Sequence, residues 1–192
     1  MNSLNIMIVG VGGQGTLLAS RILGAAFLAE GMDVKVSEVH GMSQRGGSVV
    51  TYVRAADKVA SPILDKGDAD VILAFEQLEA ARWLPYLKPD GKIIFSDQRL
   101  DPMPVLTGAA KYPEGIAEKL PALADATAVP ALGLAEQAGS SKAVNVVLIG
   151  AMVKRLGLDK AIFIKALEQT VPTRFLEMNY KAFELGYETI DN

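Results

Sequence analysis

The chain has 192 residues, of which 50% are apolar and 21% charged, and its formal net charge is −3. This length suffices for one buried core, and because charges of both signs are spread along the chain, the basic stripe of a nucleic-acid-binding protein is absent. The sequence contains no cysteine, which excludes disulfides, a thiolate nucleophile and an iron–sulfur cluster ligated by this chain.

Short apolar runs alternate with helical patterns along the first two thirds of the chain. The first run, LNIMIV, ends in a glycine and is typical of a strand buried on both faces of a parallel sheet. The sequence GVGGQG and a helical pattern beginning at Thr16 follow it. Further strands are predicted at residues 33–39, 48–54, 71–75, 92–96 and 126–129. Further helices are predicted at residues 76–87 and 114–120, with a turn at 89–91 and a proline-interrupted loop over 100–113.

The last third of the chain has helical patterns throughout. Helices are predicted at residues 131–138, 141–156 (with Ser141 as the N-cap), 159–170 and 173–185. The alternation predicts an α/β fold, a Rossmann-like open and mostly parallel sheet with helices on both faces, followed by a helical C-terminal third. No apolar run approaches the roughly 20 residues of a membrane span, and the amino-terminal segment lacks the basic region of a signal peptide. We therefore expect a cytoplasmic protein that does not contact a membrane.

The GVGGQG loop matches the pattern G-x-G-x-x-G at Gly10, Gly12 and Gly15, between a predicted strand and a predicted helix. Such a loop presents free backbone amides and a positive helix end to a phosphate group, so Gly13 and Gln14 are also candidate cofactor-binding residues. A glycine turn that is needed only for close packing of helix against strand explains the same pattern.

A dinucleotide site would also need an acidic residue to hold a ribose, and Asp33 and Glu38 are the candidates. Glu38 lies two residues before His40, where the segment HGMSQRGG begins, and this segment would crowd an adenosine there.

The segment HGMSQRGG contains the only histidine of the chain, His40. Arg45 offers a planar set of donors that suits a carboxylate or a phosphate, on a small molecule or on a neighbouring subunit. The alternative for His40 is an ordinary loop histidine that is hydrogen-bonded to a backbone carbonyl. The candidate cofactor-binding residues of this segment are Ser43, Gln44, Arg45, Gly46 and Gly47.

Three polar residues stand out elsewhere. Asn145 lies in an otherwise apolar helical segment, and because a buried amide needs partners, we expect it to bind a loop, such as a glycine loop, or to face another chain. Glu76 and Asp97 each follow a predicted strand and could touch a substrate, but a solvated carboxylate in a first helical turn is the commoner situation. The chain has few ligands for a metal, and no metal site is predicted.

Two segments, MIVGVGGQGTLLASRIL and SEVHGMSQRGGSVVTYVR, together resemble the gamma-type module of thiamine-dependent 2-oxoacid:ferredoxin oxidoreductases. The resemblance extends over essentially the whole chain, including AFEQLEAARWLPYLKPDGKIIFSD and the NVVLIGA segment, and implies one gamma-type domain over residues 1–192. It is greatest with the beta subunits of the indolepyruvate branch. Pyruvate-type members tend to have Tyr-Gly-Pro-Glu where this chain has His-Gly-Met-Ser-Gln.

The resemblance implies an accessory subunit of an indolepyruvate (arylpyruvate):ferredoxin oxidoreductase. Such a complex oxidatively decarboxylates an aryl 2-oxoacid, reduces ferredoxin and releases the aryl-acetyl coenzyme A thioester. Thiamine diphosphate, Mg²⁺ and the 4Fe–4S clusters would belong to a larger alpha subunit. The chain agrees with this, because it lacks both cysteine and the Gly-Asp-Gly motif that begins a thiamine site in this family.

We therefore expect both glycine segments to lie at one edge of the sheet and to face the large subunit. His40 and Arg45 would then close the thiamine site or receive phosphate groups of coenzyme A. Two other classes stay open: a free-standing NAD(P)-binding oxidoreductase that uses GVGGQG, and a non-enzymatic adapter whose apolar helices hold a partner. The isolated chain could also self-associate as a homo-oligomer.

Overall fold

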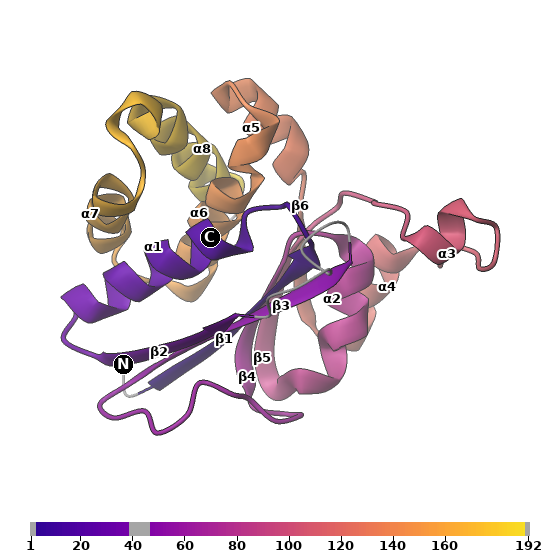
Figure 1. Ribbon diagram of the computed structural model, residues 1–192, viewed down its shortest axis with the longest axis horizontal. Coiled ribbons are helices and arrows are strands. Elements are labelled where there is room, and N and C mark those ends of the chain that lie inside the picture. Colours follow the sequence, from indigo (N-terminus) through magenta and orange to yellow (C-terminus); the bar gives the residue numbers. More distant parts are fainter. Residues whose placement is uncertain (1–2, 39–46, 191–192) are drawn as a thin grey trace.

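The computed structural model describes residues 3–38 and 47–190, and its centre is a six-stranded sheet (Figure 1). The strands are β1 (Ser3–Val11), β2 (Asp33–Glu38), β3 (Ser48–Ala56), β4 (Ala69–Ala74), β5 (Leu87–Ser96) and β6 (Asp125–Val129), in the spatial order β2-β3-β1-β4-β5-β6. Strands β1, β4, β5 and β6 pair in parallel, whereas β3 is antiparallel to both β1 and β2. The predicted open and mostly parallel sheet is confirmed, with β3 as its one reversed strand.

Helices cover both faces of the sheet, as predicted (Figure 1). One face carries α1 (Thr16–Ala29), α5 (Ala131–Ala138), α6 (Val144–Leu156), α7 (Lys160–Thr170) and α8 (Leu176–Glu188). The other face carries α2 (Gln77–Trp83) and α4 (Ile116–Leu123). Short 3-10 turns η2 (Leu84–Tyr86), η3 (Ser141–Ala143) and η4 (Thr173–Phe175) adjoin α2, α6 and α8. No helix in the described part of the chain is long and apolar enough to cross a bilayer.

Strand β1 belongs to two cores at once because its side chains alternate between the faces. Ile6 and Ile8 are buried in the core that contains α1 and α6, whereas Met7 and Val9 are buried in the core beneath α2 and α4. This two-sided burial explains why the strand reads as a continuous apolar run in the sequence.

Helix α6 is the most deeply buried of the described helices, and every residue from Val144 to Val153 is buried. It packs closely on α8 through two glycines. A Cβ atom added to Gly150 would overlap the carbonyl oxygen of Phe183, and one added to Gly186 would overlap that of Val147. The two backbones therefore touch at a distance that no side chain permits.

Three local predictions were wrong. Residues 89–91 do not form a turn but belong to β5. The register between β4 and β5 shifts there, because Ala69 pairs with Leu87 whereas Val71 pairs with Lys92. The expected loop over residues 100–113 contains a short helix, α3 (Met103–Leu106), because a proline in a first helical turn costs no hydrogen bond. The capping serine before η3 is Ser140 rather than Ser141.

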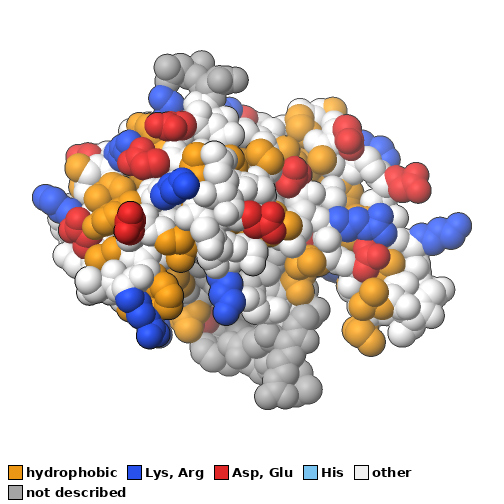
Figure 2. All heavy atoms as spheres, turned by 90° about the horizontal axis from the view of Figure 1, so that it is seen from above, with side chains coloured by type: hydrophobic (Ala, Val, Ile, Leu, Met, Phe, Trp, Pro, Cys, Tyr) orange, Lys and Arg blue, Asp and Glu red, His pale blue; other side chains and the backbone are white. Residues whose placement is uncertain are grey.

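The surface carries no extended field of one sign on the face seen in Figure 2. Acidic and basic side chains alternate there, with apolar side chains between them (Figure 2).

Candidate functional site

The strands that precede the two glycine segments, β1 and β2, end at the same edge of the sheet. Val11 at the end of β1 pairs with Ser48, and Glu38 at the end of β2 pairs with Thr51, so these two strands end side by side with the start of β3. The amide of Gly12 donates a hydrogen bond to the carbonyl oxygen of Gly47 (2.9 Å), which joins the first loop to the end of the second segment.

His40, Ser43, Gln44, Arg45 and Gly46 lie outside the described residues. Their assignments as site-closing or cofactor-binding residues remain predictions.

The side chain of Gln14 holds the first loop against the sheet. Its Oε1 accepts a hydrogen bond from the amide of Val11 (2.7 Å), and its Nε2 donates to the carbonyl oxygen of Phe75 at the end of β4 (2.9 Å). A Cβ atom on Gly10 would lie 2.8 Å from that Oε1 and 3.1 Å from the Cβ of Phe75. Gly10 and Gln14 thus have a packing role in the loop, as the second interpretation of the motif expects.

Gly15 joins the loop to α6. Its backbone is left-handed (φ 86°), it precedes the first turn of α1, and its carbonyl oxygen accepts a hydrogen bond from Nδ2 of Asn145 (3.1 Å). Asn145 is only 2% exposed, and its Oδ1 accepts from the amide of Val146 (2.9 Å). The contact between Asn145 and a glycine loop that we expected from the sequence is therefore present.

Gly13 differs from Gly10 and Gly15 in the same loop. Its backbone is also left-handed (φ 100°), but a Cβ atom there would meet nothing within 4 Å. The loop therefore combines packing glycines with one position where the backbone is open to an approaching molecule.

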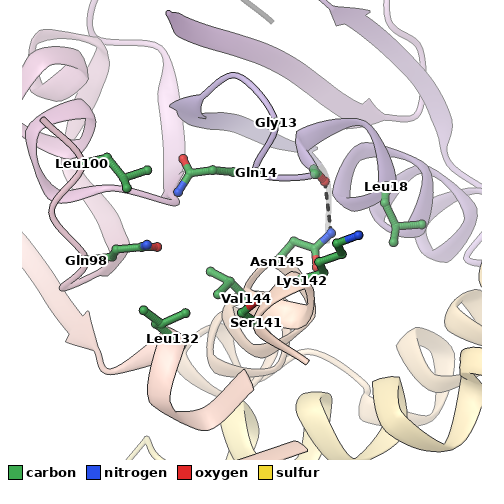
Figure 3. Close-up of a pocket in the computed structure, with 11 residues that line it drawn as sticks. Gly13, Gln14, Leu18, Gln98, Leu100, Leu132, Ser141, Lys142, Val144 and Asn145 are labelled. Atoms are coloured by element: carbon green, nitrogen blue, oxygen red, sulfur yellow. Dashed lines mark hydrogen bonds between the residues drawn. The ribbon is translucent and has the colours of Figure 1, made fainter. Parts of the chain in front are cut away.

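A cavity of about 500 Å³ opens beside Gly13, between the first loop and the start of α6 (Figure 3). Its lining residues come from segments far apart in the sequence: Gly13, Gln14, Gly15, Leu18, Gln98, Leu100, Leu132, Ser141, Lys142, Val144 and Asn145. Figure 3 shows Gln98 and Leu100 across the cavity from Asn145 and Lys142. The cavity is of the size of many small-molecule sites.

The electrostatics of the cavity favour an anion. Lys142 is an exposed cation in its lining, and α1 begins beside it without an acidic residue in the first turn and without a side-chain cap. The first amides of a helix have no partners within it, and its amino terminus carries a partial positive charge. Sequence reasoning identified Asn145 but missed Lys142, Ser141 and Gln98, because nothing in their local pattern distinguishes them from other surface residues.

A second cavity, of about 320 Å³, lies on the other side of the loop and reaches the last described residue of β2. Glu38 is part of its lining, but Oε1 of Glu38 accepts a hydrogen bond from the hydroxyl of Ser20 (2.8 Å). Asp33 lies at the opposite end of β2. Its carboxylate forms an ion pair with Lys35, which lowers the pKa of the carboxyl group, and it accepts a hydrogen bond from the amide of Val59 (2.9 Å). Asp33 therefore cannot hold a ribose at the glycine loop, which removes one of the two acidic residues that a dinucleotide site would use.

Glu76 is not the solvated carboxylate that its position predicted, since it is only 1% exposed. It precedes α2, and its Oε2 accepts a hydrogen bond from the amide of Glu79 (3.0 Å). Its Oε1 accepts from the amide of Leu100 (3.2 Å) and from the hydroxyl of Tyr112. The prediction was wrong because residues 100–112 fold back over this carboxylate, a contact between distant segments. Asp97, in contrast, is exposed.

No group of three or more His, Cys, Asp or Glu residues is arranged to hold a metal ion within residues 3–38 and 47–190. The polar lining of the cavity beside Gly13 consists of amide side chains, the hydroxyl of Ser141 and one lysine, Lys142.

Comparisons with known proteins agree with this arrangement. The family model described as pyruvate ferredoxin/flavodoxin oxidoreductase matches residues 5–189. The chain is 42% identical to the indolepyruvate oxidoreductase subunit IorB of Pyrococcus horikoshii, over 97% of this chain and 95% of that protein. Its structure is similar to the gamma subunit of a keto/oxoacid ferredoxin oxidoreductase from Geobacter sulfurreducens, with a TM-score of 0.71, 29% identity and 96% of each chain covered.

The fold also occurs within a longer chain. A 2-oxoglutarate:ferredoxin oxidoreductase from Magnetococcus marinus, solved with 2-oxoglutarate, coenzyme A and succinyl-CoA bound, matches with a TM-score of 0.73 at 20% identity. That match covers all of this chain and 32% of the longer one. The glycine loop, the mixed sheet and the near full-length matches lead to one conclusion: this chain belongs to the pyruvate ferredoxin/flavodoxin oxidoreductase family.

Proposed function

We propose that this chain is the accessory subunit of an indolepyruvate (arylpyruvate):ferredoxin oxidoreductase. The observation that carries the proposal is the 42% identity with an indolepyruvate oxidoreductase subunit along nearly the entire length of both chains. The complex decarboxylates an aryl 2-oxoacid, transfers two electrons to ferredoxin and releases the acyl group as its coenzyme A thioester. The proposal includes the cytoplasmic location predicted from the sequence, and one domain over residues 1–192.

Within this proposal, a larger alpha subunit holds thiamine diphosphate, Mg²⁺ and the 4Fe–4S clusters. The chain has no cysteine with which to ligate a cluster. The cofactors supply the carbanion and redox chemistry, and the present chain supplies binding and orientation.

The proposed task of this chain is to bind phosphate groups of coenzyme A in the cavity beside Gly13. Lys142 supplies an exposed positive charge, and the start of α1 supplies backbone amides and the positive end of a helix. The open backbone at Gly13 lets an anion approach these amides closely. The proposal keeps Arg45 and His40, which lie outside the described residues, as residues that close the thiamine site or receive phosphate groups of coenzyme A.

The test is Lys142→Ala in the assembled complex. We expect the KM for coenzyme A to rise about fivefold with kcat unchanged, because the lysine would bind the ground state and the transition state alike. Steady-state kinetics with coenzyme A as the varied substrate measure this effect. The matched control is Lys181→Ala, which removes an exposed lysine of α8 outside the cavity and should leave the KM unchanged.

An unchanged KM in Lys142→Ala would remove the cavity from the proposal. If Arg45→Ala also left both the KM and the association of the subunits unchanged, the chain would be an adapter that only holds the complex together.

A further inference from the structure

The wall of the cavity opposite Lys142 belongs to a segment that leaves the sheet after β5. Gln98 and Leu100 line the cavity, and the chain then extends away from the body through α3 before it returns at Tyr112 (Figure 1). Gln98 is held by two hydrogen bonds, from its amide to Oγ of Ser96 (3.2 Å) and from the amide of Gln77 to its carbonyl oxygen (3.2 Å). The amide of Leu100 donates a hydrogen bond to a buried carboxylate.

That carboxylate is Glu76, and it contacts both ends of the segment. Its Oε1 accepts from the amide of Leu100 (3.2 Å) at the beginning and from the hydroxyl of Tyr112 at the end. Its Oε2 accepts from the amide of Glu79 in the first turn of α2 (3.0 Å). The two oxygens therefore have separate partners: Oε2 caps the amino terminus of α2, and Oε1 joins the two ends of a loop, which are 12 residues apart in the sequence.

The surroundings of Glu76 and Tyr112 stabilise the hydrogen bonds between this carboxylate and the two ends of the segment, which together we call the clamp. Tyr112 is buried, and burial together with the hydrogen bond to Glu76 raises the pKa of its hydroxyl, so the phenol remains a donor. The guanidinium of Arg99 lies 4.3 Å from the centre of the Tyr112 ring, a cation–π contact that helps to hold the ring in place. A buried carboxylate with three donors is stable where an unpaired one would be costly.

We propose that Glu76 and Tyr112 are positioning residues for the ligand of the cavity. They touch no ligand themselves but act through Leu100: Glu76 accepts from its amide, and Tyr112 holds Glu76 in place. Leu100 and Gln98 form the wall that faces Lys142. The proposal rests on the function proposed for the cavity and adds a second requirement to it: the hydrogen bonds of Glu76 must hold the wall formed by Gln98 and Leu100 in place.

Tyr112→Phe is the decisive variant, because it removes the hydroxyl but keeps the ring, the contact with Arg99 and the cap of α2. In the assembled complex we expect the KM for coenzyme A to rise about threefold, with kcat unchanged. Hydrogen exchange followed by mass spectrometry should show faster exchange of the amides of residues 98–106, by about tenfold, while β1 and β4 remain as protected as before.

The matched control is Tyr180→Phe, which removes another tyrosine hydroxyl that donates to a glutamate, Glu168 (2.8 Å), on helices outside the cavity. It should change neither the KM nor the exchange of residues 98–106. A Tyr112→Phe complex that has the parental KM overturns the inference, and so does one that loses thermal stability but keeps its KM, because Tyr112 would then be structural only.

Lys142→Ala separates this failure from that of the proposed function. If Lys142→Ala raises the KM and Tyr112→Phe does not, the cavity binds coenzyme A without the clamp and only the inference fails. If neither variant changes the KM, the cavity is not the site, and the proposed function of the cavity falls together with the inference.

Discussion

Gly13 and Gly15 stand two positions apart in the same loop and have different surroundings. Both have a left-handed backbone, but a Cβ atom on Gly15 would lie 2.7 Å from Nδ2 of Asn145, whereas one on Gly13 would meet nothing. The motif predicts glycine at position 15, whereas Gly13 occupies one of its variable positions. Which glycine serves the packing and which leaves the backbone open depends on α6, a helix that follows 130 residues later.

This difference predicts unequal costs for two alanine substitutions. Gly13→Ala should lower the free energy of unfolding by about 1 kcal/mol, the cost of a left-handed backbone with a Cβ atom. Gly15→Ala should cost about 1 to 2 kcal/mol more, because Asn145 must also move. Urea unfolding of the two variants measures the difference, and equal costs would mean that Asn145 does not approach Gly15 closely.

Glu76 shows the limit of reasoning from neighbouring residues. Its place between a strand and a helix predicted a solvated carboxylate, and the prediction of a helix start there was right: Glu76 caps α2. Its burial results from Leu100 and Tyr112, and no local pattern relates those residues to position 76.

At the scale of elements, α6 and α8 depend on each other through reciprocal glycines. The apolar pattern predicted both helices, but it could not show that Gly150 and Gly186 form the contact between them. A glycine within a helix is unfavourable by itself, so its presence in both helices marks the place where their backbones meet.

Gly150→Ala should therefore reduce the free energy of unfolding by about 3 kcal/mol, since the helices must separate to admit the methyl group. The matched control is Gly133→Ala in α5, where a Cβ atom meets nothing within 4 Å; this change should be neutral or stabilise by up to about 1 kcal/mol through helix propensity. Chemical denaturation measures both values. Similar results for the two variants would contradict the close packing of α6 on α8.

At the scale of the whole molecule, the arrangement of acidic residues bears on the class of function. A free-standing dinucleotide-binding enzyme needs an acidic group near the glycine loop. Asp33 is at the opposite end of β2, and Glu38 is engaged by Ser20.

We therefore expect the isolated chain, titrated with NADH, to show no saturable energy transfer from Trp83, the only tryptophan of the chain. Fluorescence emission of the reduced nicotinamide, excited through the tryptophan, is the measurement. Saturable transfer at micromolar NADH would revive the NAD(P)-dependent alternative.

The sequence by itself determined the order and type of most elements, the strand–loop–helix position of GVGGQG and the family resemblance. These depend on local periodicity, on glycine spacing and on contiguous motifs, all of which are present in a short stretch of chain. Even the contact of Asn145 was foreseeable, because a buried amide must find a partner.

Only the tertiary structure decided the reversed direction of β3, the inclusion of residues 89–91 in β5, the burial of Glu76 and the cavity between Lys142 and Gln98. Each of these depends on which distant segments come to lie side by side. The packing of the sheet and its helices settles that pairing, and the residues around each position carry no record of it.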